Sequence, residues 1–208
     1  MKSPGSRSIW ESLISLVLLV VWVFVLEACS RSQHAMAIFH ARDIGGVMPA
    51  LDFNLTSQYR TTVTAANLKG KTTLLYFGYT HCPDVCPTTL EGLAQALKRL
   101  GPKADSVRVL FVSVDPRRDS AEVLRRYASA FGPQFVGLTG TDRQLTSLTK
   151  RYRVAYRRDS PDVSGDYAVY HSSAVFVFDG HGRVRLLVAP SETTEQLAED
   201  LRAVVTSG

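Results

Sequence analysis

Two cysteines in one short segment are the residues of this chain most able to do chemistry. Cys82 and Cys86 are separated by three residues in the segment His81-Cys-Pro-Asp-Val-Cys-Pro87. In a regular helix the Cβ atoms of residues i and i+4 lie about 5–6 Å apart, whereas a disulfide requires about 3.5–4.5 Å. Pro83 and Pro87 disfavour helical backbone in the residues before them. The pair can therefore either close into a Cys82–Cys86 disulfide or hold a metal ion between two sulfur atoms.

Two thiolates favour a soft metal ion, which points to Cu(I), with zinc as the competitor. Two sulfur atoms leave such an ion under-coordinated, so a third ligand is sought among the five histidines. His171 directly precedes a predicted strand at Ser173–Phe178, and its loop lies where ligands bind in α/β folds, beyond the strand ends. The other four histidines are expected to be ordinary polar residues of tether, loop or turn: His34, His40, His81 and His181.

Strands and helices that alternate along the chain must position these residues. Near-continuous apolar runs at Thr73–Tyr79 and Val107–Val114 predict central strands covered on both faces. Between them, leucines and an alanine at helical spacing predict a helix that ends at Gly101-Pro102. The pattern also predicts strands at Leu51–Leu55, Phe135–Leu138, Ser173–Phe178 and Val184–Val188, and helices at Ala121–Phe131, Asp142–Tyr152 and Thr193–Val205. This order predicts an α/β fold with a mixed central sheet flanked by helices.

Two of the predicted helices begin with capping signals. Asp119 with Glu122, and Thr88 with Glu91, have the spacing of a capping box. The proline before Thr88 would also suit the first helical position. Either boundary places Cys86 at or just outside the N-terminus of its helix. There the positive end of the helix dipole stabilises a thiolate, so the sequence predicts a lowered thiol pKa.

The first 28 residues differ in character from the rest of the chain. Lys2 and Arg7 precede an apolar run at Leu13–Leu26, which is typical of a secretory signal. The run is shorter than the roughly 17–25 residues that span a bilayer. It ends in Leu-Glu-Ala-Cys29, which resembles the bacterial lipobox, whose cysteine is lipidated, although Glu27 departs from that pattern.

Three fates of this segment remain open: lipidation of Cys29, an uncleaved anchor and ordinary cleavage. Each places the remaining domain outside the cytoplasm. We therefore divide the chain into a signal peptide or membrane anchor (1–28), a tether (29–50) and one domain (51–208). Lys and Arg exceed Asp and Glu by only 24 to 19, and an exported chain without a recognition motif is not expected to bind nucleic acid.

Three segments together resemble the SCO/SenC family of copper chaperones. They are Tyr76–Leu90 around the cysteines, Val114–Asp119 and Tyr170–Ser172, and the resemblance extends from about Leu51 to Val205. It implies a thioredoxin-like domain tethered to the membrane on its periplasmic face. It also implies a role in assembling the copper A centre of cytochrome c oxidase.

The resemblance assigns roles to individual residues. Cys82, Cys86 and His171 would be the copper ligands, for Cu(I), Cu(II) or both. The expected partners are the copper A site of cytochrome c oxidase subunit II and, as a second candidate, another periplasmic copper carrier. The family commonly has an acidic residue where this chain has Tyr170. The Asp115-Pro116-Arg117 stretch matches a family motif and is also a plain turn signal before a helix.

Two other functions compete with copper delivery. A thiol–disulfide oxidoreductase would use Cys82 and Cys86 to keep the cysteines of the oxidase reduced. A peroxiredoxin-like peroxidase shares the order strand, loop, cysteine and helix, but it uses one peroxidatic cysteine with a distant resolving partner. Metal binding needs both thiols reduced, because a disulfide offers no thiolate. The expected protein is a metallochaperone rather than an enzyme, and the one enzymatic activity considered for it is thiol–disulfide exchange by Cys82 and Cys86.

Overall fold

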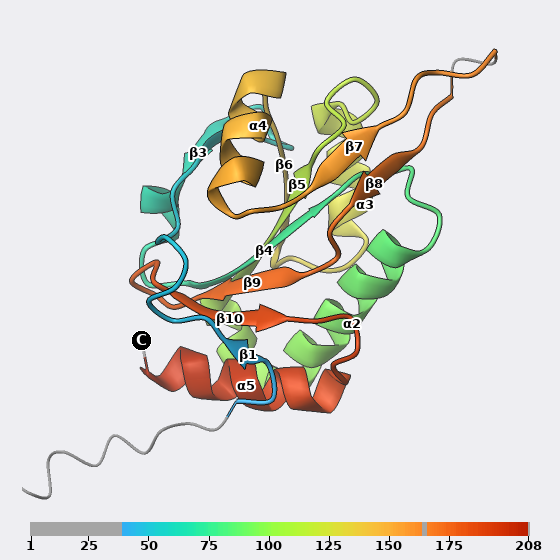
Figure 1. Cartoon of the computed structure of the whole chain (residues 1–208). Coiled ribbons are helices and arrows are strands. Elements are labelled where there is room, and N and C mark those ends of the chain that lie inside the picture. The colour runs from blue at the N-terminus through green and yellow to red at the C-terminus, as the bar shows by residue number, and fades with distance from the viewer. Residues whose placement is uncertain (1–38, 164–165, 208) are drawn as a thin grey trace, which may run out of the picture. The chain divides into compact units, whose positions relative to one another are not determined.

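An eight-stranded mixed sheet forms the centre of the molecule (Figure 1). The computed structural model describes residues 39–163 and 166–207. The strand order is β1-β10-β9-β4-β5-β6-β2-β3. The strands are β1 (Arg42–Asp43), β2 (Asn54–Ser57), β3 (Thr62–Thr64), β4 (Thr72–Gly78), β5 (Val107–Ser113), β6 (Phe135–Thr139), β9 (Val175–Phe178) and β10 (Val184–Val188). Parallel pairs join β4, β5 and β6, and the other pairs are antiparallel.

Helices cover both faces of this sheet, as the sequence predicts (Figure 1). They are α2 (Val85–Leu100), α3 (Ala121–Ser129), α4 (Asp142–Arg151) and α5 (Thr194–Ser207), with two short 3₁₀ helices, η1 (Ala65–Leu68) and η2 (Gly101–Ser106). Buried side chains of α2, α3 and α5 form one hydrophobic core with the sheet. Those of α4 belong to a second core on the other face.

Strand β4 separates the two cores and leads into the cysteine segment. All seven of its residues are buried. Its side chains alternate between the faces, so Leu74 and Tyr76 lie in the first core, while Leu75 and Phe77 lie in the second. It pairs with β5 on one side and β9 on the other. A strand buried on both faces needs a continuous apolar run, which is why this element was predictable.

A separate two-stranded sheet carries the histidine. It is a hairpin of β7 (Tyr156–Arg158) and β8 (Val169–His171), and it projects at the end of the main sheet at which β4 leads into the cysteine loop (Figure 1). The pairing is antiparallel, with Tyr156 opposite His171. The chain then enters β9 at the centre of the main sheet. His171 is therefore the last residue of β8, and three residues separate it from β9. The sequence predicts a loop here and misses the hairpin, because strands of three residues give no periodic signal.

The predicted capping boxes are wrong at both helices. Helix α2 begins at Val85 with Asp84 at its N-cap, so Thr88 already lies inside the helix. Helix α3 is capped by Ser120, whose side chain accepts a hydrogen bond from the Val123 backbone. Asp119 is fully buried and accepts hydrogen bonds from Thr80 in the cysteine loop and from Ser113 at the end of β5 instead. Spacing alone cannot show that a carboxylate is already engaged by residues distant in the chain.

Part of the segment before residue 51 is attached to the domain. Strand β1 pairs with β10, and the neighbouring Ala41 and Ile44 are buried in the two cores. Asp200 of α5 accepts hydrogen bonds from the backbone N–H groups of His40 and Ala41, at 2.9 and 2.7 Å. Residues 39–50 therefore differ from the predicted tether: the strand is too short to give a periodic signal.

The predicted signal or anchor at 1–28 and the predicted lipidation site Cys29 lie outside the described residues. Within the described part of the chain, no helix is long and apolar enough to cross a membrane.

Candidate metal centre

The two cysteines lie where strand β4 passes through a short loop into helix α2. Cys86 is in the first turn of α2 and is fully buried, whereas Cys82 is half-buried in the loop. Both are free thiols. The Cys86 backbone N–H donates to the Cys82 sulfur at 3.4 Å. The first N–H groups of a helix lack partners within the helix, so this donor is available to a sulfur atom or to a thiolate.

His171 faces this pair from the β7–β8 hairpin. Its Nε2 lies 3.2 Å from the Cys86 sulfur, and its Nδ1 lies 3.0 Å from the carbonyl oxygen of Ser172. A carbonyl oxygen can only accept, so Nδ1 carries the proton and Nε2 turns its lone pair to the cysteines. The ligand atoms of Cys82, Cys86 and His171 all lie within 4.8 Å of one another. The structure thus brings together the three residues singled out in the sequence.

Aromatic side chains enclose the buried side of this group. The Tyr76 hydroxyl donates to the Cys86 sulfur at 3.6 Å. The rings of Tyr76 and Tyr79 meet the His171 ring edge to face, with centroids 6.0 and 5.9 Å away. Phe77 points into the second core on the other face of β4. Tyr76 and Tyr79 therefore form walls of the site, and Phe77 serves the core.

Burial sets the protonation of the group. It raises the pKa of the Cys86 thiol to about 12, against the lowering effect of the Tyr76 hydroxyl. Burial also lowers the pKa of His171. The predicted lowering of the thiol pKa is therefore wrong for Cys86, because desolvation outweighs the helix dipole. With both groups neutral, the Cys86 S–H is the donor to His171 Nε2, and a metal must displace a thiol proton.

Gly78, the last residue of β4, permits the close approach of the helix. A Cβ atom at this position would lie 2.7 Å from the Cys86 sulfur and 2.7 Å from the Phe111 ring. Any side chain would therefore push the sulfur away from its position. Sequence reasoning missed this residue. Its signal is a glycine at the end of an otherwise apolar buried strand, just before the cysteine segment.

A buried carboxylate fixes the start of the cysteine loop. Asp119 accepts hydrogen bonds from the Thr80 backbone N–H at 2.9 Å, the Thr80 hydroxyl at 2.6 Å and the Ser113 hydroxyl at 2.5 Å. The exposed His81 lies 3.7 Å from Asp119 and is not part of the ligand group. Asp119 is a second residue whose role the sequence did not reveal.

The remaining histidines lie elsewhere. His40 pairs with Glu199 at 2.9 Å, and His181 is exposed in the turn between β9 and β10. His34 lies outside the described residues. None of these is in the ligand group found among the described residues.

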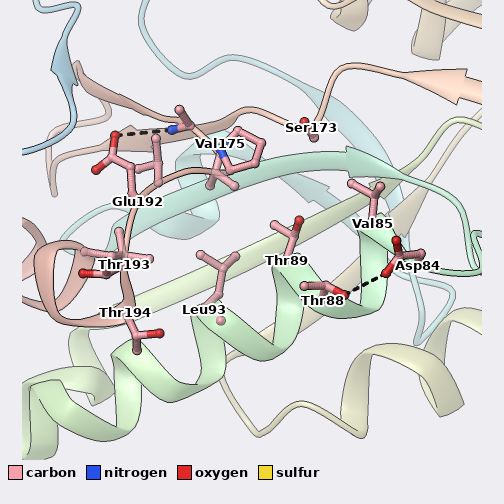
Figure 2. Close-up of a pocket in the computed structure, with 15 residues that line it drawn as sticks. Asp84, Val85, Thr88, Thr89, Leu93, Ser173, Val175, Glu192, Thr193 and Thr194 are labelled. Carbon is pink, nitrogen blue, oxygen red and sulfur yellow. Dashed lines mark hydrogen bonds between the residues drawn. The ribbon is translucent and has the colours of Figure 1, made fainter.

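A pocket of about 340 Å³ adjoins the segments that carry the ligands (Figure 2). Asp84 and Val85, from between the two cysteines, and Ser173, two residues after His171, lie at one end of it. Glu192, before α5, lies at the other end. The pocket shares segments with the candidate centre but none of the three ligands.

The donor set suits a soft metal ion. Two sulfur atoms and one imidazole nitrogen match copper, whereas Mg²⁺ and Ca²⁺ require oxygen ligands. The sulfur and nitrogen atoms converge without any carboxylate in the group. The residues present therefore fit copper by the chemistry of their donors.

Comparison with known sequences identifies relatives across most of the chain. A family model described as SCO1/SenC matches residues 47–206. The mitochondrial protein SCO2 homolog of Homo sapiens is 36% identical over 153 residues, which cover 73% of this chain and 58% of the relative. The mitochondrial protein SCO2 of Saccharomyces cerevisiae is 38% identical over 182 residues, which cover 84% and 59%. The match thus spans less than two thirds of these relatives.

Solved structures with copper bound share the fold. ScoI of Bradyrhizobium japonicum has 39% identity and a TM-score of 0.69, with 74% of this chain and 98% of that chain covered. Yeast Sco1 has 32% identity and a TM-score of 0.70, with 77% and 91% covered. These neighbours confirm the predicted thioredoxin-like fold. With a family match over most of its length and relatives above 30% identity, the chain belongs to the SCO1/SenC family.

Proposed function

We propose that this protein binds copper through Cys82, Cys86 and His171 and helps to assemble the copper A centre of cytochrome c oxidase. The observation that carries the proposal is the approach of His171 Nε2 to 3.2 Å from the Cys86 sulfur, with Cys82 in the same group. The related structures of ScoI and Sco1 contain copper. The membership of the chain in their family supports the same cargo here.

The residues around the group suit a copper carrier. The Ser172 carbonyl holds the imidazole in the tautomer that leaves Nε2 free, and the two tyrosines shield its inner side. The backbone N–H of Cys86 stabilises charge on the Cys82 sulfur. Cys82 is also the more exposed of the two cysteines. Cys82 is therefore the copper ligand that is replaced first when a cysteine of the acceptor binds the ion. Subunit II of the oxidase is such an acceptor.

The thiol pair also supports a second candidate function, reduction of the oxidase cysteines. Cys82 would attack a disulfide of the partner, forming a mixed disulfide and releasing one partner thiol. Cys86 would then attack Cys82, which releases the second partner thiol and leaves a Cys82–Cys86 disulfide. The favouring observation is the accessible Cys82 beside the buried Cys86.

We further propose that the domain works on the periplasmic face of the cell membrane, held by residues 1–28 or by a lipid on Cys29. The support is the basic and apolar pattern of the N-terminal segment and the cysteine at its end. Intact-mass spectrometry of the native protein tests it. A mass that includes residues 1–28 contradicts lipidation, and a mass that begins at an unmodified residue after 28 contradicts both forms of attachment.

Replacing His171 tests the proposed copper site. We expect the reduced full chain to bind one Cu(I), with X-ray absorption showing two sulfur neighbours and one nitrogen. The His171→Ala variant should lose the nitrogen and bind Cu(I) more than about tenfold more weakly, since the ligand is gone while both thiols remain. His181→Ala is the matched control, because its imidazole is exposed in a distant turn.

The same variant separates the two functions. Reduction of an oxidised subunit II should continue in His171→Ala if thiol exchange is the main activity, whereas copper loading should fail. Wild-type affinity for Cu(I) in His171→Ala would contradict the three-ligand site.

A further inference from the structure

The loop between β5 and α3 contacts both segments that carry the candidate ligands. On one side Asp119 holds the cysteine loop through Thr80. On the other side Asp115, which is fully buried, accepts a hydrogen bond from the Tyr167 hydroxyl at 2.6 Å. Tyr167 lies four residues before His171, in the chain that leads into β8. One short loop therefore reaches both halves of the site.

Arg118 takes part in the contact between the β5–α3 loop and the residues that precede β8. Its Nε donates to Asp115 at 2.5 Å, and its Nη1 donates to Asp166 at 2.6 Å. Its guanidinium also stacks on the Tyr167 ring, 3.7 Å from the centroid. The side chain is only 16% exposed. A planar cation that is bonded at two edges and stacked on a ring is fixed in orientation, and such pairs are strongest when they are shielded from water.

A second chain of contacts runs from the same guanidinium through Tyr79 to the imidazole. It is 5.7 Å from the centroid of the Tyr79 ring, and that ring contacts His171 edge to face. Arg118 thus lies between Tyr167, which precedes the hairpin strand, and Tyr79, which forms a wall of the site. Arg118 itself contacts Tyr167 and Tyr79 and none of the three candidate ligands in these two contacts.

The hairpin needs such a connection. Two-stranded hairpins are marginally stable in water, and β7–β8 is not hydrogen-bonded into the main sheet. The β7 side is anchored to α4 by the ion pair of Arg158 with Asp142 at 2.5 Å. On the other side Val169 of β8 is buried in the second core, and Asp115 and Arg118 hold the residues just before β8, Asp166 and Tyr167, to the β5–α3 loop.

We propose that Arg118 is a positioning residue for His171. With Asp115 it holds Asp166 and Tyr167, and through them it keeps the start of β8 where the imidazole faces the cysteines. Asp119, four residues after Asp115, holds the other half of the site. The β5–α3 loop therefore sets the separation between imidazole and thiols. This inference rests on the proposed copper site for its consequence, but not for its geometry.

The Arg118→Ala variant tests the inference in the full chain. In the metal-free protein we expect faster amide hydrogen exchange at residues 166–172 and unchanged reactivity of Cys82 and Cys86. With Cu(I) we expect about 10–100-fold weaker binding and a diminished nitrogen signal in X-ray absorption, the size seen when a residue that orients a metal ligand is lost. Arg118→Lys, which retains the charge but not the planar stacking, should rescue the affinity in part.

Two further variants make the test specific. Tyr167→Phe keeps the ring under Arg118 but removes the bond to Asp115, and should produce a smaller loss in the same direction, even if Arg118→Ala does not fold. Arg126→Ala is the matched control, because this arginine is exposed on α3 and pairs only with Glu122 in the same helix. It should leave hydrogen exchange and copper affinity unchanged.

The outcomes separate the two proposals. Unchanged hydrogen exchange at 166–172 in both Arg118→Ala and Tyr167→Phe overturns the positioning role, whatever the metal does. Equal acceleration in the cysteine loop and the hairpin also overturns it, since that result shows general loosening. If wild-type protein shows no nitrogen ligand to copper, the proposed site fails, while the exchange measurement still decides the role of Arg118.

Discussion

Each ligand residue of the candidate centre has a neighbouring polar group that orients it or hydrogen-bonds to its sulfur atom. The Ser172 carbonyl sets the tautomer of His171, and the first turn of α2 presents a backbone N–H to the Cys82 sulfur. The Tyr76 hydroxyl donates to the Cys86 sulfur. These contacts act on protonation as well as on geometry. Burial, against the effect of the Tyr76 hydroxyl, keeps Cys86 and His171 neutral in the metal-free site, so the Cys86 thiol donates to the imidazole.

The Tyr76→Phe variant isolates one of these contacts. Burial raises the pKa of Cys86 to about 12, and the Tyr76 hydroxyl opposes this because it stabilises the thiolate. Its loss should raise the pKa of Cys86 further and slow alkylation at a fixed pH by up to about tenfold, the effect of losing one hydrogen bond of about 1.4 kcal/mol to the charged form. Quantitative peptide mass spectrometry measures the rate at Cys86, and Cys82 in the same molecule is the control. Faster alkylation of Cys86 would contradict this role of the hydroxyl.

At the scale of elements, the site depends on how closely helix α2 approaches the end of strand β4. Gly78 removes the side chain at the point of contact, and Phe111 of β5 fills the space beneath. The cysteine in the first turn of α2 is therefore held at a distance set by the sheet. The hairpin then brings His171 to the same place.

The Gly78→Ala variant tests this approach. The added Cβ would overlap the Cys86 sulfur and the Phe111 ring, so the helix must shift. We expect a loss of about 1–3 kcal/mol in the free energy of unfolding, as for other overpacked cores, together with weaker Cu(I) binding. The matched control is Gly92→Ala in helix α2. Its added Cβ meets nothing within 4 Å, so this variant should be as stable as the wild type or more stable by up to about 1 kcal/mol. Denaturant unfolding measures both variants. Equal stability of the two would show that α2 can move freely.

The sequence predicted those elements whose signal is local. The buried strands β4 and β5 are continuous apolar runs, and α2 shows a helical stripe. The cysteine spacing alone left a disulfide and a metal site open, and the resemblance to the SCO/SenC family implied the three ligands Cys82, Cys86 and His171. Contacts between distant residues were not predictable, because Asp115 meets Tyr167 only after folding. For the same reason the capping box at Asp119 was wrong.

At the scale of the whole molecule, the two ends of the described chain are fastened to each other. Strand β1 extends the sheet next to β10, and helix α5 bonds to the backbone just before this strand. The side chain responsible is Asp200, which is buried. The first described residues, from Phe39 on, are therefore fixed beside α5.

The Asp200→Ala variant releases this fastening. The carboxylate accepts from the backbone N–H groups of His40 and Ala41, which would be left without partners near the core. We expect a loss of about 1–3 kcal/mol in the free energy of unfolding and faster hydrogen exchange in residues 39–44. Glu199→Ala is the control, because Glu199 is exposed and bonds only to the His40 side chain. Copper affinity should be unchanged in both variants, since neither residue contacts the ligands. Weaker copper binding in Asp200→Ala alone would contradict this expectation, because it would show that the copper site depends on the attachment of strand β1.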